Sequence, residues 1–327
     1  MEKAVRDSYG RTIEYMRISI TDRCNLRCRY CMPDGITQVA MSEILTYEEI
    51  RKVCMLAAEL GIRKIKITGG EPLVRKGCVD LIRGIREIPG VETITMTTNG
   101  VLLGNYAKQL KEVGVDSVNI SLDTLDPEEF YKITGKRELQ EVLAGIRAAK
   151  TAGLQVKLNA VNRKELDPLP LVRYAQKENL PLRFIEMMPV GYGKKYVGRS
   201  NEELRKTLAT VCGNPECITD REELSRMGSG PAVYYRFSDL KVPVGFISAI
   251  HGKFCDTCNR IRLTAEGYLK LCLCYDKGAD LRQALREGEK EKLRTIMEET
   301  IFRKPAAHCF EHPEEMTETH EMVKIGG

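Results

Sequence analysis

The sequence has no tryptophan, few aromatic residues and no long apolar run. Aromatic residues make up 6% of the 327 residues, and the formal net charge is only +5. Base stacking and a broad basic surface are therefore poorly supported, which argues against an RNA- or DNA-binding protein. No segment approaches the length of a transmembrane helix, and the N-terminal residues lack the apolar core of a signal peptide. We expect a cytoplasmic protein with no membrane or nucleic-acid partner.

Cysteine, in contrast, is abundant, with 12 residues in the chain. In a reducing compartment, clustered cysteines indicate metal ligands or catalytic groups rather than disulfides. Six cysteines form two clusters, which are Cys24, Cys28 and Cys31 (the first triplet) and Cys255, Cys258 and Cys272 (the second triplet). The others are interpreted as buried small hydrophobic residues or idle thiols; they are Cys54, Cys78, Cys212, Cys217, Cys274 and Cys309.

The chain alternates strand and helix patterns from residue 13 to about residue 190. The first helix is predicted to begin after the cap Thr46 and to end at Gly61. Six or more such units imply a parallel sheet covered by helices. Two further units, which a complete eight-stranded barrel needs, are not found. We therefore predict an α/β fold of the incomplete (βα)6 type, a TIM-like barrel open on one side, over residues 1–200.

Residues 201–327 are predicted to form a second, C-terminal α+β domain. The segment 232–255 indicates two strands joined by a turn, and 260–273 a hairpin around Glu266 and Gly267. The polar tail from His312 onward is expected to be extended or mobile. In the barrel, ligand-binding groups are expected at the C-terminal ends of the strands, where the polar and glycine-rich segments fall.

The first triplet, in "CNLRCRYC", follows the first predicted strand. A structural zinc site normally takes four protein ligands, as does a four-iron cluster. Three thiolates leave one metal position open, and an open position is typical of a catalytic metal to which a substrate binds. The spacing therefore favours a catalytic cluster over structural zinc.

The second triplet again supplies three ligands, unless Cys274 is the fourth, in which case zinc is plausible. Cys272 and Cys274 alternate on what the pattern indicates is a strand, so their side chains are expected on opposite faces. Arg260 and Arg262 also lie two residues apart, and we expect them on one face, where paired guanidinium groups suit phosphate or carboxylate.

"CNLRCRYC" after one strand and "TGGEP" after the next resemble the radical S-adenosylmethionine (SAM) superfamily. The resemblance implies a [4Fe-4S] cluster on the first triplet whose open iron binds SAM, and reductive cleavage of SAM to a 5′-deoxyadenosyl radical. It also implies that the backbone of Gly69, Gly70 and Glu71 passes the methionine ammonium. The implied SAM-binding residues are Tyr30, Gly70, Ser121, Asn159 and Met188.

A wider set of segments is similar to the GTP 3′,8-cyclase family of molybdenum cofactor biosynthesis. They include "ITDRCNLRCRYCMP", "KITGGEPLVR", "NISLDTL", "RFIEMMPVG", "FCDTCNRIRLTAEGYLKLC" and the terminal "GG", and they span residues 17–327. The resemblance implies a second [4Fe-4S] cluster whose open iron binds GTP. The radical would then remove the ribose C3′ hydrogen, and the sugar radical would attack guanine C8.

The same resemblance assigns roles to individual residues. The terminal Gly326 and Gly327 would reach into the active site and support catalysis. Lys66 stands where the family often has arginine, which keeps the charge but loses the bidentate fork. The implied GTP-binding residues are Arg17, Lys64, Lys66, Thr97, Lys157, Arg183, Arg260 and Arg262.

The family also implies partners: a homodimer, an external reductant, and cyclic pyranopterin monophosphate synthase as the recipient of the product. Two alternatives stay open at this point. One is a radical SAM peptide maturase with an auxiliary cluster, although such enzymes usually carry a larger C-terminal cysteine set. The other is a zinc-stabilised nucleic-acid-binding protein.

Overall fold

The computed structural model describes residues 4–35, 39–196, 198–228 and 230–326. Its centre is one curved 12-stranded sheet in the order β12-β11-β10-β1-β2-β3-β4-β5-β6-β9-β8-β7. The neighbouring strands from β10 through β1 and β6 to β9 run parallel, and antiparallel strands extend the sheet at both ends. The predicted α/β partial barrel is confirmed.

The strands are β1 Tyr15–Ser19, β2 Lys64–Thr68, β3 Thr93–Thr98, β4 Ser117–Ser121, β5 Gln155–Asn162, β6 Leu182–Glu186, β7 Pro215–Cys217, β8 Val233–Phe237, β9 Val244–Ile247, β10 Arg260–Leu263, β11 Tyr268–Lys270 and β12 Gly278–Asp280. The α-helices are α1 Tyr47–Glu59, α2 Cys78–Arg86, α3 Leu103–Glu112, α4 Pro127–Thr134, α5 Leu139–Thr151, α6 Leu169–Glu178, α7 Asn201–Cys212, α8 Arg221–Met227, α9 Arg282–Glu287 and α10 Lys290–Phe302. Short 3-10 helices are η1 Pro72–Val74, η2 Gly191–Lys195 and η3 Pro313–Glu315.

The first helix illustrates how local sequence signals set the element boundaries. The Thr46 side chain accepts from the Glu49 N–H, and the Glu49 carboxylate accepts from the Thr46 N–H, forming a capping box. After the helix, Gly61 has φ +86°, a left-handed conformation that glycine adopts without strain. A Cβ at Gly61 would lie 2.7 Å from the Ala4 Cα.

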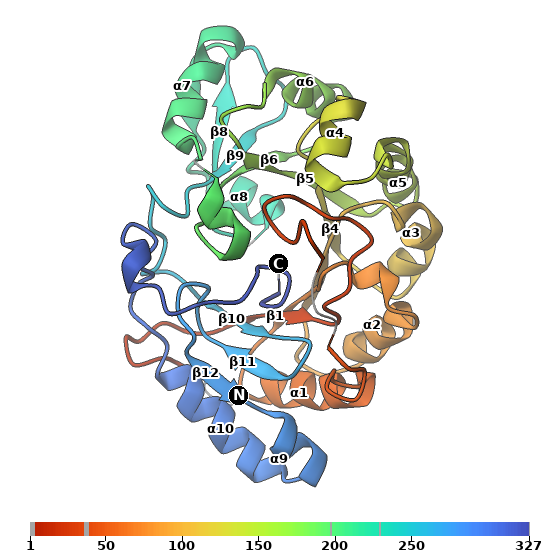
Figure 1. Cartoon of the computed structure of the whole chain (residues 1–327), viewed down its shortest axis with the longest axis vertical. Coiled ribbons are helices and arrows are strands. Elements are labelled where there is room, and N and C mark those ends of the chain that lie inside the picture. The colour runs from red at the N-terminus through yellow and green to blue at the C-terminus, as the bar shows by residue number, and fades with distance from the viewer. Residues whose placement is uncertain (1–3, 36–38, 197, 229, 327) are drawn as a thin grey trace.

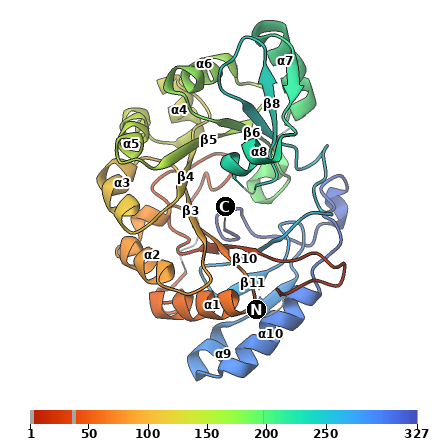
Figure 2. The ribbon, with the colours of Figure 1, turned by 180° about the vertical axis from the view of Figure 1, so that it is seen from behind.

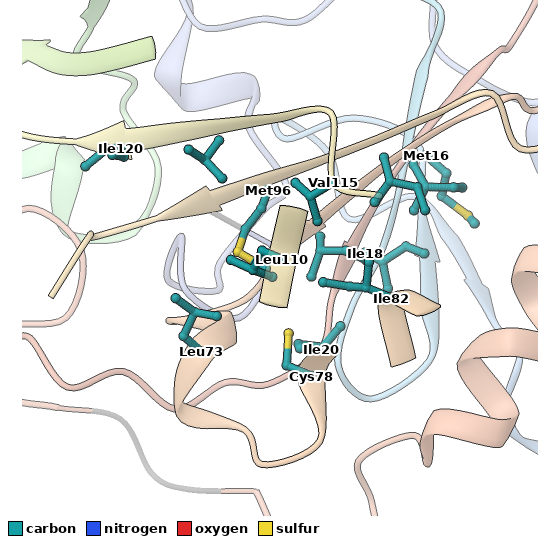
Figure 3. Packing of buried hydrophobic residues seen from close by; sticks show 14 of the residues in the cluster. Met16, Ile18, Ile20, Leu73, Cys78, Ile82, Met96, Leu110, Val115 and Ile120 are labelled. Carbon is teal, nitrogen blue, oxygen red and sulfur yellow. The ribbon is translucent and has the colours of Figure 1, made fainter. Parts of the chain in front are cut away.

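Helices α1 to α6 cover the outside of the curved sheet, and the end of the tail, as far as Gly326, lies on its inner side (Figure 1; Figure 2 from behind). The outer face of the sheet packs against these helices, and the hydrophobic core lies between them. Figure 3 shows Met16 and Ile18 of β1 and Met96 of β3 packed with Ile82 of α2 and Leu110 of α3. Each of these five residues is 0% exposed. Because side chains alternate along a strand, the polar residues between them face the barrel interior.

The two parallel strands that flank the six predicted ones come from the C-terminal region. β9 pairs with β6, with Val244 opposite Leu182, and β10 pairs with β1, with Arg260 opposite Tyr15. Strands from both sides of residue 200 therefore share one sheet, and the division into domains at that residue stays a prediction. The hairpin around Glu266 and Gly267 forms as predicted, as β10 and β11.

Two expectations about the C-terminal region are wrong. The tail is packed rather than mobile, because Glu318, Val323 and Ile325 are buried at 1%, 1% and 3% exposure. In addition, β11 ends at Lys270 and pairs with β12 from residue 278, so Cys272 and Cys274 lie in the hairpin loop between them and not on a strand. Within the described ranges, no helix is long and apolar enough to span a membrane.

Candidate active site

The first triplet lies in the loop that leaves the C-terminal end of β1. The Cys24 Sγ accepts hydrogen bonds from the Leu26 N–H at 3.4 Å and from the Asn99 Nδ2 at 3.7 Å. Burial raises the pKa of Cys24 to about 11 and that of Cys31 to about 12. Burial, followed by the charges of Cys31 and Cys24, also raises the pKa of Cys28. The three thiols are thus close enough to repel when ionised, and binding of a metal would release their protons.

The glycine-rich loop after β2 holds this cysteine loop in place. The Gly70 N–H donates to the Thr21 carbonyl and the Glu71 N–H to the Arg23 carbonyl, both at 2.8 Å. A Cβ at Gly69 would lie 2.7 Å from the Thr21 oxygen, and a Cβ at Gly70 would lie 2.4 Å from the Arg23 oxygen. Side chains at both positions would therefore push the cysteine loop away.

Glu71 ties the ends of β2 and β3 together. Its carboxylate accepts from the Leu73 N–H at 3.1 Å, the Thr98 hydroxyl at 2.8 Å and the Asn99 N–H at 2.7 Å. Burial raises the pKa of Glu71 to about 7 despite these hydrogen bonds. The Glu71 side chain is thereby committed to the protein, which leaves the loop backbone as the part that can face a ligand.

Of the predicted SAM-binding residues, Tyr30, Gly70 and Met188 follow β1, β2 and β6, whereas Ser121 ends β4 and Asn159 lies within β5. The Tyr30 hydroxyl donates to the Asp123 Oδ2 at 2.9 Å, which links the first-triplet loop to the end of β4. Ser121 and Asn159 are in-register partners on β4 and β5. These residues line one edge of the barrel; Met188, just after β6, packs against the hydrophobic cluster that includes Val190 and Ile325.

Cationic side chains converge inside the barrel. Burial lowers the pKa of Lys66 well below its ordinary value, and the positive charges of Arg17, Arg183, Lys157 and Arg260 lower it further. Lys66 is on β2 and Arg183 on β6, with three strands between them in the sheet, so their charges interact across the barrel interior. We name this set the cation group; its members are Arg17, Lys66, Lys157, Arg183, Arg260 and Arg262.

Two residues that are predicted to bind GTP, Lys64 and Thr97, are not members of the cation group. Lys64 points to the same face as Lys66 but sits near the other end of β2, where its Nζ pairs with the Glu14 carboxylate at 3.6 Å. Thr97 is in register with Asn119, whose Oδ1 accepts from the Arg183 guanidinium at 2.5 Å. On the same face of β3, the buried Thr95 hydroxyl has no hydrogen-bond partner among the described residues, which suits an interior that holds a polar ligand.

The second triplet lies beside the cation group. Arg260 Nη2 donates to the Cys258 Sγ at 3.7 Å, and Ile261 and Leu263 alternate with Arg260 and Arg262 into the core. Burial, the largest influence, raises the pKa of Cys258, but Lys304 and Arg260 outweigh it and lower that pKa to about 7. Cys258 is thus ready to act as a thiolate ligand near neutral pH.

Cys274 is paired with Cys309 in a disulfide, and both residues are buried. This pairing removes Cys274 as a fourth ligand of the second triplet. It also corrects the expectation that Cys274 and Cys309 are idle thiols. Cys54, Cys78 and Cys212 are buried as expected, with Cys78 beside Ile20 in Figure 3.

Sulfur spacing separates a single metal ion from a larger cluster. Tetrahedral zinc with Zn–S bonds near 2.3 Å places its sulfurs about 3.8 Å apart. In the described part of the chain, the one group of at least three His, Cys, Asp or Glu ligand atoms within 4.8 Å of one another is Asp276, Glu318 and His320. Neither cysteine triplet is that compact, so in this structure neither has the sulfur spacing of a tetrahedral zinc site.

The C-terminal tail enters the barrel between the two triplets. The Gly326 carbonyl accepts from the Arg262 Nη1 at 3.1 Å, and a Cβ at Gly326 would lie 3.7 Å from the Ser19 Cβ. Earlier in the tail, Glu318 forms a buried ion pair with Lys270, which anchors the tail to β11. Gly327 lies outside the described residues.

Sequence reasoning missed three residues of this site: Asp123, Asn99 and Lys304. Asp123 and Asn99 stand in the strand-end segments "SLD" and "TTNG", and their position after predicted strands is a signal that could have found them. Lys304 stands 32 residues beyond Cys272, just after α10, and no local pattern marks it.

Two family models match the chain. The model of the radical SAM superfamily matches residues 18–166, and the model "Molybdenum Cofactor Synthesis C" matches residues 180–310. The fold resembles the crystal structure of Streptococcus suis SuiB bound to S-adenosylmethionine, with TM-score 0.65 and 13% identity over 95% of this chain and 77% of that one. It also resembles native anSMEcpe with bound AdoMet, with TM-score 0.59 and 17% identity over 90% of this chain and 82% of that one. Fold and site together define a radical SAM enzyme, a class that uses SAM and an iron–sulfur cluster.

Relatives that match this chain along nearly their full length show which family within this class it belongs to. A GTP 3′,8-cyclase from Clostridium perfringens (strain SM101 / Type A) is 43% identical over 99% of this chain and 100% of its own length. GTP 3′,8-cyclases from Petrotoga mobilis and Peptoclostridium acidaminophilum are 43% and 44% identical, over 98% of this chain and 99% and 98% of their own lengths. The chain belongs to the GTP 3′,8-cyclase family.

Proposed function

We propose that the chain converts GTP into (8S)-3′,8-cyclo-7,8-dihydroguanosine 5′-triphosphate, the first step of molybdenum cofactor biosynthesis. The observation that carries the proposal is the cation group, which gathers inside the barrel with Lys157 and Arg183 buried and its other members partly buried. Cations that repel one another in a buried interior require an anionic ligand, and a triphosphate carries about four negative charges near neutral pH. Such a ligand distinguishes this function from the peptide-maturase alternative.

Each triplet has its own role in the proposal. Cys24, Cys28 and Cys31 would hold the cluster that binds SAM, with Tyr30, Gly70, Ser121, Asn159 and Met188 around SAM. Cys255, Cys258 and Cys272 would hold a second cluster, which would supply a binding position for the guanine base. When bound, the first cluster and SAM supply the carbon radical that removes the ribose C3′ hydrogen.

The chain itself would orient the nucleotide. The Asn159 Oδ1 accepts from the Arg183 Nε at 2.9 Å, so a residue assigned to SAM touches one assigned to GTP. The two ligands would therefore meet near this contact. Lys64, Thr97 and the members of the cation group would hold the triphosphate, and Arg262 would also hold the tail through the Gly326 carbonyl. The tail, with Gly326 and Gly327, would close the site against water.

The proposed partners are those that the family implies: an external reductant, a second copy of the chain in a homodimer, and cyclic pyranopterin monophosphate synthase as recipient of the product. We place the enzyme in the cytoplasm. The proposal is tested by incubating anaerobically reconstituted protein with reductant, SAM and GTP. We expect 5′-deoxyadenosine together with a cyclised nucleotide, and SAM cleavage that GTP leaves unchanged, with no such nucleotide, would refute it.

Replacing Arg260 or Arg262 by methionine should weaken GTP binding by roughly 1.5–3 kcal/mol, the scale of a hydrogen bond to a charged group. The dissociation constant would rise roughly 10- to 150-fold. Isothermal titration calorimetry on the reconstituted protein measures this, with Arg147→Met on the exposed face of α5 as the control. Affinities equal to that of the control would remove the two arginines from the site.

GTP affinity should fall as the pH rises above about 8. Burial, followed by the charge of Arg183, lowers the pKa of Lys157 to about 8, so in the free protein Lys157 is charged below that pH and neutral above it. A triphosphate favours the charged form, and binding must therefore take up protons near pH 8. The dissociation constant should rise by up to about tenfold per pH unit, the limit for one proton.

Titrations between pH 7 and 9 check this linkage in the wild type and two variants. Lys157→Arg should keep a constant affinity over that range because arginine stays charged. Lys157→Met should bind weakly at each pH. The same pH profile in all three proteins would mean that the nucleotide or another group titrates, and not Lys157.

A further inference from the structure

The segment that follows α10 lies next to the second triplet. In this strap, residues 304–308, Lys304 is 3% exposed and His308 is 7% exposed. The Lys304 Nζ donates to the carbonyl of Leu271, the neighbour of Cys272, at 2.5 Å. The His308 N–H donates to the Cys255 Sγ at 3.4 Å. The strap thus contacts the triplet at both ends, although it stands more than 30 residues away in the sequence.

Arg11 fastens the strap to the cysteine loop. Its Nη1 donates to the carbonyls of Cys255 and Ala306, both at 2.7 Å, and its Nη2 donates to the Pro305 carbonyl at 2.6 Å. The Arg11 Nε pairs with the Asp7 carboxylate at 2.6 Å, and these side chains are only 8% and 0% exposed. Because the Arg11 guanidinium is bonded to both the strap and the loop that contains Cys255, neither segment can move freely relative to the other. The position of Lys304 relative to the thiols is therefore set by the fold.

Lys304 has the second triplet as its anionic neighbour. In the described ranges no carboxylate forms an ion pair with Lys304. Burial lowers the pKa of Lys304, whereas the thiolate charges of Cys258 and Cys272 raise it. A buried ammonium without a carboxylate is costly unless another anion compensates it. The thiolates supply that compensation.

We propose that Lys304 is the buried counter-ion of the second iron–sulfur cluster and raises its reduction potential. The inference rests on the second cluster proposed above. Three thiolates on a four-iron core of charge 2+ leave a net charge of about −1, which one ammonium balances. Each added electron makes the cluster more negative, so a fixed positive charge nearby favours the reduced form. Lys304 does not touch the nucleotide and acts only through the cluster.

The test uses the full chain with Cys24, Cys28 and Cys31 replaced by alanine, so that only the second triplet can hold a cluster. In this parent we expect about four irons per chain after anaerobic reconstitution. Midpoint potentials are then measured by redox titration followed by electron paramagnetic resonance. Lys304→Met should shift the midpoint to a more negative potential, and Lys304→Arg should keep it near that of the parent. Lys290→Met, which removes a charge from the exposed start of α10, is the matched control.

The outcomes separate this inference from the proposed function. A parent that binds no iron would overturn the second cluster itself. A parent that holds its cluster, with the same midpoint in Lys304→Met, would overturn only the counter-ion role. If Lys304→Met loses iron while Lys304→Arg keeps it, the charge is needed and the inference stands. If both variants lose iron equally, the side chain serves packing and not charge, and the inference fails.

Discussion

Replacing Cys28 by alanine should reduce the formation of 5′-deoxyadenosine from SAM to background. Cys28 lies between Cys24 and Cys31 in a single loop, and its pKa is raised first by burial and then by the charges of these two thiols, so the three sulfurs are electrostatic neighbours. With two thiolates the first cluster would lack its third protein ligand. Iron content should fall from about eight to about four per chain, and the cleavage of SAM is measured by chromatography.

The matched control is Cys54→Ala, which removes a thiol on the buried face of α1. This variant should keep its iron and its SAM cleavage, apart from any loss of stability. Full activity of Cys28→Ala would contradict the assignment of the first triplet. Inactivity with all eight irons still bound would also contradict it, because the defect would then lie outside cluster ligation.

Cys272→Ala, in contrast, should keep cleaving SAM in an uncoupled reaction while it forms no cyclised nucleotide. Cys272 lies in the loop between β11 and β12, and its electrostatic neighbours include Lys304 and Arg262 rather than the first triplet. Loss of the second cluster would remove the anchor of the guanine base and leave the SAM site intact. Chromatography of one reaction mixture measures both products.

Cys217→Ala provides a control for the second triplet because Cys217 is exposed on β7. It should retain both activities. Equal loss of SAM cleavage and of cyclisation in Cys272→Ala would mean that the triplets do not have separate roles. Cyclisation at the wild-type rate would exclude Cys272 from the reaction.

Most of the barrel can be predicted from the sequence because its determinants are local. Alternation of apolar and polar residues sets the outer and inner faces of the strands, as Met16 and Ile18 against Arg17 illustrate. Capping residues such as Thr46 mark where helices begin. Helix α4 carries such signals too: the cap Asp126, Pro127 at the first turn and Gly135 at its end.

The features that could not be predicted from the sequence depend on contacts between segments that are distant in the chain. No local pattern indicates that β9 and β10 flank the six parallel strands, because pairing depends on where the chain returns. Likewise, Cys274 meets Cys309 through the packing of the tail, 35 residues away. Lys304 reaches the second triplet only because Arg11, near the N-terminus, fastens its strap. Short motifs contain the candidate ligands, but the surroundings of those ligands are set by the whole fold.

The measurement that most directly tests the proposed function uses GTP that carries deuterium at ribose C3′. Reconstituted protein is incubated anaerobically with this GTP, SAM and a reductant, and the products are examined by mass spectrometry. If the cation group holds the ribose against the SAM site, deuterium must appear in 5′-deoxyadenosine and be absent from the cyclised nucleotide. Unlabelled 5′-deoxyadenosine beside a nucleotide that keeps its deuterium would show that the chain does not remove the C3′ hydrogen.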